Sequence, residues 1–172
     1  MTNIPLKVIL TGPESSGKTT LAKQLAYTLE TGLTPEFSRA CLLHLGRPYR
    51  YEDLAWILAG QQAWETWHER NSKNGLLVCD TDWTVIRVWE LFRFNRIDHT
   101  RNKEIDSNTC YLLCSPDIPF ESDQLRENPG ERDQLFALYH ALLVEKKARF
   151  VILEGNRDER FDKALGIIRK LC

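Results

Sequence analysis

The sequence predicts an α/β fold of three layers, in which a five-stranded parallel sheet carries helices on both faces. Short apolar runs at residues 6–10, 33–37, 76–80, 109–114 and 150–153 are each followed by a segment of helical length. The runs are mostly continuous rather than alternating, which is typical of strands that are buried on both faces. Strands that alternate with helices pair in parallel through right-handed crossovers.

The size and composition of the chain indicate one domain. We expect a single domain over residues 1–172, with a formal net charge of −1 that gives no electrostatic footprint for nucleic acid. The apolar runs are too short to cross a bilayer, and the N-terminus lacks the pattern of a secretory signal. The five cysteines have neither disulfide nor zinc-site spacing. We therefore expect a cytoplasmic protein with no nucleic-acid or membrane partner, and we leave a homo-oligomer open.

The first apolar run leads into a complete G-x-x-x-x-G-K-[ST] motif. Residues 12–19 read GPESSGKT, and the helical run after them places Leu21, Leu25 and Leu29 on one face. The glycines let the backbone turn its N–H groups around a phosphate. Lys18 can reach the β- and γ-phosphates, and the hydroxyl of Thr19 can ligate Mg²⁺. The motif predicts a P-loop fold that binds ATP or GTP with Mg²⁺. The loop residues expected to contact the nucleotide are Gly12, Glu14, Ser15, Ser16, Gly17, Lys18, Thr19 and Thr20.

The later elements follow from helix stops and from hydrophobic periodicity. Gly32 ends the first helix, and Pro35 weakens the prediction of the second strand. Helical segments are expected at 38–45, 51–70, 83–94, 133–147 and 157–171, separated by polar and glycine-containing turns. Residues 93–107 are polar and basic, which predicts a surface loop or a frayed helix end.

Polar side chains follow the predicted strands at the edge of the sheet where parallel α/β folds bind ligands. Asp80 closes the third strand and can hold Mg²⁺ or cap the next helix. Asp82 can contact a substrate, but it is the better placed of the two aspartates to cap the helix that begins at Trp83. Glu36 can orient or deprotonate a substrate hydroxyl, or it can pair with Arg39 one helical turn away.

Residues 115–132 contain three prolines and many charges, which predicts a lid after the fourth strand. Arg126 and Arg132 can close over a transferring phosphoryl group, or they can pair with acidic neighbours in a solvated loop. After the fifth strand, Asn156 can contact an adenine edge or begin the last helix. The tryptophans at 56, 64 and 67 can line an aromatic pocket together with the amide of Gln62, or they can pack in the core.

Taken together, these motifs resemble the kinase domain of the NadR-type NAD-salvage proteins over nearly the whole chain. The matching stretches are GPESSGKTT, PEFSRA, LAGQQAWE, VCDTDW, SPDIPFESDQLRENPGERDQL and LEGNRDERF. The resemblance implies transfer of a phosphoryl group from ATP to the 5′-hydroxyl of nicotinamide riboside. The positions that match family residues are Lys18, Thr19, Glu36, Arg39, Gln62, Asp80, Asp82, Arg126 and Arg132.

The motifs and the family resemblance together predict one set of residue roles. Catalytic roles are expected for Lys18, Glu36, Asp80, Arg126 and Arg132, substrate contacts for Glu36, Arg39, Gln62, Asp82 and Trp83, nucleotide contact for Asn156, and Mg²⁺ ligation by Thr19 and Asp80. Relatives of this type commonly carry an adenylyltransferase domain, and some carry a DNA-binding domain, neither of which we expect in residues 1–172. The alternatives are a kinase for another nucleoside or a nucleoside monophosphate, and a regulatory module that hydrolyses ATP slowly.

Overall fold

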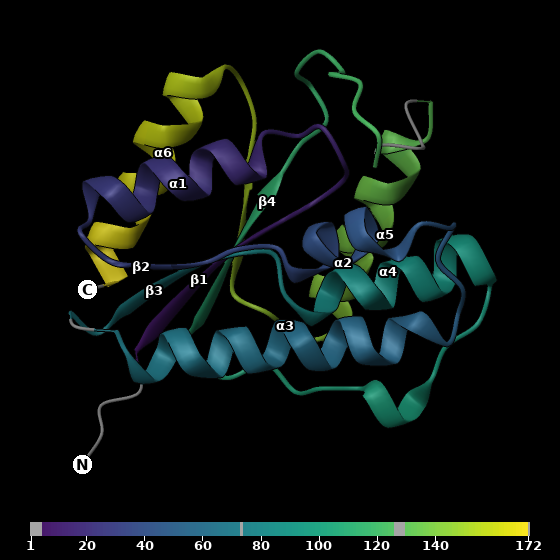
Figure 1. The fold of residues 1–172 in the computed structure, drawn as a ribbon. Helices are drawn as coiled ribbons and strands as arrows, with labels where there is room; N and C mark the ends of the chain where they lie inside the picture. Colours follow the sequence, from purple (N-terminus) through teal and green to yellow (C-terminus); the bar gives the residue numbers. More distant parts are fainter. Residues whose placement is uncertain (1–4, 73, 126–129, 172) are drawn as a thin grey trace.

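The computed structural model describes residues 5–72, 74–125 and 130–171. Within them the expected strands form one parallel sheet with the order β2-β3-β1-β4-β5 (Figure 1). The strands are β1 (Leu6–Thr11), β2 (Gly32–Thr34), β3 (Leu76–Asp80), β4 (Thr109–Cys114) and β5 (Phe150–Leu153). The predicted three-layer fold class is therefore confirmed. The second strand is shorter than expected, because the chain turns at Pro35 and Glu36 already precedes a helix.

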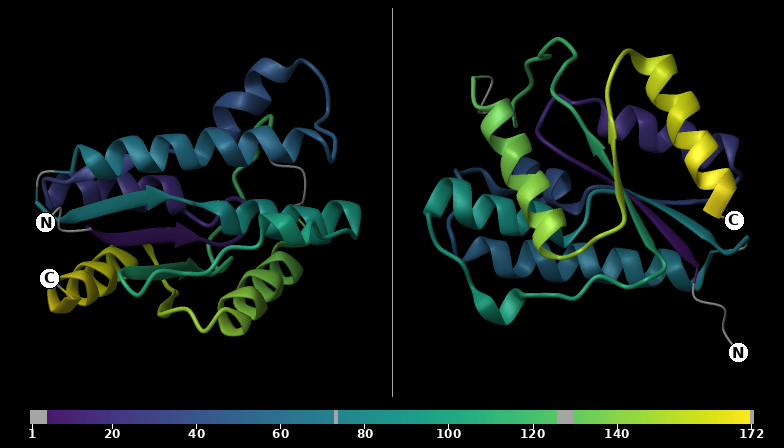
Figure 2. Two further views of the ribbon diagram at one scale, coloured as in Figure 1. Left: turned by 90° about the horizontal axis from the view of Figure 1, so that it is seen from below. Right: turned by 180° about the vertical axis from the view of Figure 1, so that it is seen from behind.

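Helices cover both faces of the sheet. Figure 1 and the right view of Figure 2 show α1 (Lys18–Thr28) and α6 (Arg157–Leu171) side by side on one face. The other face carries α3 (Asp53–Arg70), α4 (Trp83–Phe94) and α5 (Arg132–Glu145), with α2 (Phe37–Leu45) packed against α3. A single 3₁₀ turn, His99–Arg101, lies in the long connection to β4. No helix among the described residues has the length and apolar character needed to cross a membrane.

The core consists of two apolar clusters, one on each face of the sheet. Because successive strand residues point to opposite faces, Val8 and Leu10 pack toward α1 and α6, whereas Ile9 packs toward α3 and α4. All of β3 and β4 is buried, which explains why both strands appear in the sequence as unbroken apolar runs. Four cysteines are buried in or beside these clusters as free thiols, namely Cys41, Cys79, Cys110 and Cys114.

The register of the strands determines where the polar loops meet. Leu10 of β1 lies opposite Asp80 of β3, and Thr11 lies opposite Leu113 of β4. The loops after β1, β3 and β4 therefore leave the sheet at the same edge, next to one another. This edge holds the candidate site.

Candidate active site

The loop between β1 and α1 has a backbone that suits glycine. Gly12 has φ +129° and Gly17 has φ +81°, and a Cβ on Gly12 would lie 2.6 Å from the carbonyl oxygen of Cys114. Gly17 stands at the N-cap of α1, and no side chain caps the helix there. The first N–H groups of α1 are therefore open to an anion, as the motif predicts.

Lys18 folds back over this loop. Its Nζ donates to the carbonyl of Pro13 at 2.6 Å and to Oγ of Ser16 at 3.5 Å. Oγ of Ser16 donates to the same carbonyl at 2.7 Å. Lys18 and the other residues of the phosphate loop line one end of the main cavity.

Asp80 is buried at the end of β3 and lies beside Thr19. Its Oδ1 has no hydrogen-bond partner among the described residues, while the hydroxyl of Thr19 hydrogen-bonds to the carboxylate. Burial, and then the charge of Glu36, raise the pKa of Asp80 to about 6. An open carboxylate oxygen next to a hydroxyl fits Mg²⁺, which is commonly bound by one or two protein oxygens together with nucleotide phosphates.

Glu36 lines the same cavity as Lys18. It stands at the N-cap of α2, and its Oε1 accepts a hydrogen bond from Oγ of Ser38 at 2.6 Å. Arg39 pairs with Asp123 of the lid at 2.6 Å, and not with Glu36 as one interpretation of the sequence had it. Arg39 therefore joins α2 to the lid.

The described part of the lid lies against the phosphate loop. The backbone N–H of Glu121 donates to Oγ of Ser15 at 2.7 Å. Arg132 donates through Nη1 to the carbonyl of Ser15 at 3.2 Å and to that of Ile118 at 3.0 Å. Arg132, which was expected to close over a transferring phosphoryl group, thus contacts the backbone of the phosphate loop and of the lid. Arg126, the other expected lid arginine, lies outside the described residues.

Asp82 and Trp83, both expected to contact a substrate, are buried away from the cavity wall. Asp82 caps α4, since Oδ1 accepts from the N–H of Thr84 at 2.9 Å and Oδ2 accepts from the hydroxyl of Tyr111 at 2.6 Å. The capping interpretation is therefore the one that the structure supports.

Burial, and then the carboxylate of Asp82, raise the pKa of nearby Glu65 to about 7.

Neither Gln62 nor its neighbour Gln61 is among the residues that line the cavity. Gln61 is buried, with 3% of its surface exposed. Oε1 of Gln61 accepts from the N–H of Phe37 at 2.9 Å. Its Nε2 donates to Oε1 of Glu65 at 3.3 Å and to the carbonyl of Thr81 at 3.4 Å. Gln61 therefore joins the start of α2, next to Glu36, to the turn after β3, next to Asp80.

The phase of α3 could have revealed Gln61. The buried residues Leu54, Ile57 and Leu58 are followed at the next helical repeat by position 61. The tryptophans hide this phase in the sequence, because large apolar residues normally mark the buried face of a helix, whereas Trp56 is 44% exposed and Trp67 is 60% exposed. Of the two alternatives for the tryptophans, core packing does not hold for Trp56 and Trp67, and neither of them lines the main cavity.

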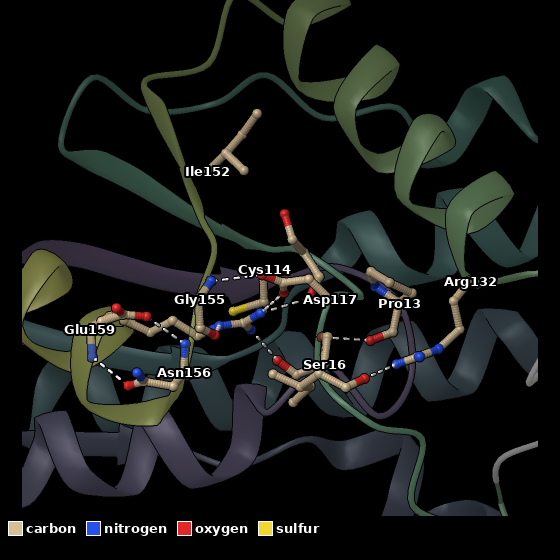
Figure 3. A network of polar contacts seen from close by, with 12 residues as sticks. Pro13, Ser16, Cys114, Asp117, Arg132, Ile152, Gly155, Asn156 and Glu159 are labelled. Carbon is tan, nitrogen blue, oxygen red and sulfur yellow. Dashed lines mark hydrogen bonds and ion pairs between the residues drawn. The ribbon is translucent and has the colours of Figure 1, made fainter.

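Asn156 begins the last helix. Its Oδ1 accepts from the N–H groups of Asp158 and Glu159 at 3.0 and 3.1 Å. In return, Oε2 of Glu159 accepts from the N–H of Asn156 at 2.8 Å (Figure 3). This reciprocal capping supports the alternative in which Asn156 begins the last helix.

The cavity has a volume of about 570 Å³ and extends from the phosphate loop to an aromatic end. At that end the rings of Tyr49 and Trp89 lie 5.1 Å apart, and the guanidinium of Arg93 lies 4.3 Å from the centre of the Tyr49 ring. None of the sequence motifs pointed to these residues. On α4 the signal is the spacing of Val85, Trp89 and Phe92, which share a helical face and all line the cavity.

Comparison with known families agrees with this geometry. The sequence profile of the AAA domain matches residues 7–160. The chain belongs to the AAA domain family. No curated protein matches the sequence significantly.

Several solved structures of low sequence identity share the fold of this chain. A NadR protein in complex with NR superposes with a TM-score of 0.81 at 21% identity, over 99% of this chain and 52% of that one. A NadR protein in complex with NAD and AMP-PNP gives 0.79 at 18% identity, over 99% and 50%. Thymidylate kinase from Ehrlichia chaffeensis gives 0.67 at 11% identity, over 95% and 98%. The chain thus spans about half the length of the NadR chains, and its fold is that of P-loop nucleoside and nucleotide kinases.

Proposed function

We propose that this protein is a kinase that transfers the γ-phosphoryl group of ATP to a hydroxyl of a nucleoside-type acceptor, with nicotinamide riboside as the acceptor. The observation that carries the proposal is a single cavity that has the phosphate loop at one end, the Glu36 carboxylate on its wall and aromatic rings at the other end. The likeness to a NadR protein in complex with NR supports the choice of acceptor.

The phosphate end supplies charge stabilisation. Thr19 and Asp80 would hold Mg²⁺, which neutralises part of the charge on the phosphates when it is bound. Lys18 exchanges the Pro13 carbonyl for the β- and γ-phosphates, and the open N–H groups of α1 bind the same anion. Phosphoryl transfer requires mainly positioning and charge neutralisation from a protein, and these groups provide both.

Glu36 is the proposed base. Its carboxylate accepts a hydrogen bond from the acceptor hydroxyl in place of the one that Ser38 donates now. The hydroxyl oxygen forms a bond to the γ-phosphorus, the bond from that phosphorus to the bridging oxygen breaks, and ADP leaves. The hydroxyl proton passes to Glu36.

The aromatic end is the proposed site of the acceptor's ring. Tyr49 and Trp89 offer ring faces on which a flat heterocycle stacks. A Trp89→Ala variant should raise the KM for the acceptor about tenfold, because stacking of a base on an aromatic ring contributes about 1–3 kcal/mol. Trp67→Ala is the matched control, since Trp67 is an exposed tryptophan outside this cavity.

The proposal is tested by ADP release from Mg-ATP, with no acceptor, with nicotinamide riboside, and with a panel of nucleosides and nucleoside monophosphates. Strong stimulation by nicotinamide riboside alone supports the proposal in full. Stimulation by another nucleoside or monophosphate keeps the kinase and replaces the acceptor. Slow turnover that no acceptor stimulates contradicts the kinase and favours a regulatory module that hydrolyses ATP.

A further inference from the structure

The guanidinium of Arg160 joins three loops at the nucleotide end of the cavity. Arg160 lies in the first turn of α6 and is 4% exposed. Its Nε donates to the carbonyl of Gly155 at 2.8 Å, its Nη1 to that of Ser16 at 2.8 Å and its Nη2 to that of Ser115 at 3.0 Å (Figure 3). These carbonyls belong to the loops that follow β5, β1 and β4, which are neighbours in the sheet.

Asp117 compensates the buried charge and extends the network. Its Oδ1 accepts from Nη2 of Arg160, and its Oδ2 accepts from the backbone N–H of Gly155 at 2.6 Å. One carboxylate therefore connects the start of the lid both to the arginine and to the turn before α6. Paired in this way, a buried guanidinium avoids the large free-energy penalty of an isolated charge.

The contact with Ser16 bears directly on the phosphate loop. In a planar trans peptide the C=O and the following N–H point in opposite directions. Because Arg160 holds the carbonyl of Ser16, the N–H of Gly17 points away from the arginine. Arg132 holds the carbonyl of Ser15 in the same manner and so orients the N–H of Ser16. Two arginines from different helices thus orient two consecutive N–H groups of the motif.

We propose that Arg160 is a positioning residue for nucleotide binding, which aims the N–H of Gly17 at the bound phosphates and is itself held by Asp117. This inference rests on the proposed function, since it requires a nucleotide in the loop. It concerns the nucleotide end of the cavity alone. Loss of the arginine therefore weakens nucleotide binding and leaves acceptor binding at the aromatic end unchanged.

The test measures binding of Mg-ADP by isothermal titration calorimetry, with no acceptor present. Arg160→Met should raise the Kd about tenfold or more, because the carbonyl of Ser16 loses its donor and the N–H of Gly17 is no longer held toward the phosphates. Arg160→Lys should restore only part of the affinity, since an ammonium lacks the planar fork that reaches several carbonyls. Arg169→Met, at an exposed arginine near the end of α6, is the matched control and should bind as the parent does.

Steady-state kinetics separate positioning from a loss of structure. The KM for ATP should rise by the same factor as the Kd, whereas the KM for the acceptor stays within twofold of the parent's. Asp117→Asn, at a partly exposed position, gives a second test that does not depend on a buried substitution, and it should raise the Kd for Mg-ADP by a smaller factor.

Three results would overturn the inference. The first is a Kd within twofold of the parent's in both Arg160→Lys and Asp117→Asn. The second is an equal loss in the Arg169→Met control, which would indicate a general effect of charge. The third is a parent protein that fails to bind Mg-ADP at all, and this result alone also overturns the proposed function.

Discussion

Replacement of Asp80 by asparagine is expected to stabilise the free protein while it removes the proposed activity. Burial, and then the charge of Glu36, raise the pKa of Asp80 from its ordinary value of 3.8 to about 6. The ionised carboxylate is therefore less favourable in the folded protein than in the unfolded chain. The difference between the two pKa values corresponds to about 3 kcal/mol at about pH 8, where the carboxyl group is ionised in both states.

The pH dependence follows from the sign of this shift. A raised pKa contributes stability when the group is protonated, and that contribution is lost as the pH rises from about 4 through about 6. Asparagine has nearly the same shape as aspartate and never ionises. Asp80→Asn should therefore exceed the parent in free energy of unfolding by up to about 3 kcal/mol at about pH 8, by about half of that at about pH 5, and hardly at all below about pH 4.

Urea unfolding followed by tryptophan fluorescence measures this free energy, with EDTA present to exclude divalent ions. The control is Asp106→Asn, an exposed aspartate, which should change the free energy of unfolding by less than about 0.5 kcal/mol. If the Asp80→Asn protein is no more stable than the parent at about pH 8, the ionised carboxylate of Asp80 does not destabilise the folded protein, and this prediction is wrong. Full activity of that variant with Mg-ATP would refute the proposed role of Asp80 in holding the ion.

Three further substitutions test other parts of the site. Lys18→Ala should lower kcat at least a hundredfold, about 3 kcal/mol of transition-state stabilisation, and a kcat within tenfold of the parent's would contradict the proposed role of the ammonium. Gly12→Ala should prevent binding of Mg-ADP, because its Cβ would lie 2.6 Å from the carbonyl oxygen of Cys114; calorimetry with Mg-ADP measures it. Gln61→Ala should destabilise the protein by about 1–3 kcal/mol in urea unfolding, since it leaves buried backbone groups of α2 and of the turn after β3 without a partner. Gln62→Ala should change the same quantity by less than about 0.5 kcal/mol, and equal effects of the two would contradict the orientation of α3.

The sheet could be predicted because its strands are buried on both faces. β4 and β5 begin and end where the apolar runs do, and β3 ends in the expected carboxylate. The phosphate loop could be predicted because its backbone geometry depends on glycines that are visible in the sequence. Gly12 and Gly17 both take backbone conformations with positive φ, which other residues adopt only under strain.

The orientation of individual side chains could not be predicted in the same way. Asp80 and Asp82 are only two positions apart in the sequence. The backbone conformation after β3 leaves an oxygen of Asp80 without a hydrogen-bond partner among the described residues and places Asp82 as the cap of α4. Gln61 and Gln62 differ by the phase of one helix. Arg160 was missed because its partners come from separate loops, and the carbonyl that it holds at Ser16 lies 144 positions earlier in the chain.

The carboxyl group of Glu65 has a consequence for calorimetry. Its pKa rises from an ordinary value of 4.5 to about 7 in the folded protein, so near pH 6 the folded protein holds a proton there that the unfolded chain has released. Folding is therefore accompanied by proton uptake, and the stability that this proton contributes declines as the pH rises through about 7. The heat of unfolding near neutral pH then includes protonation of the buffer, so that it differs between phosphate and Tris even though the protein is the same.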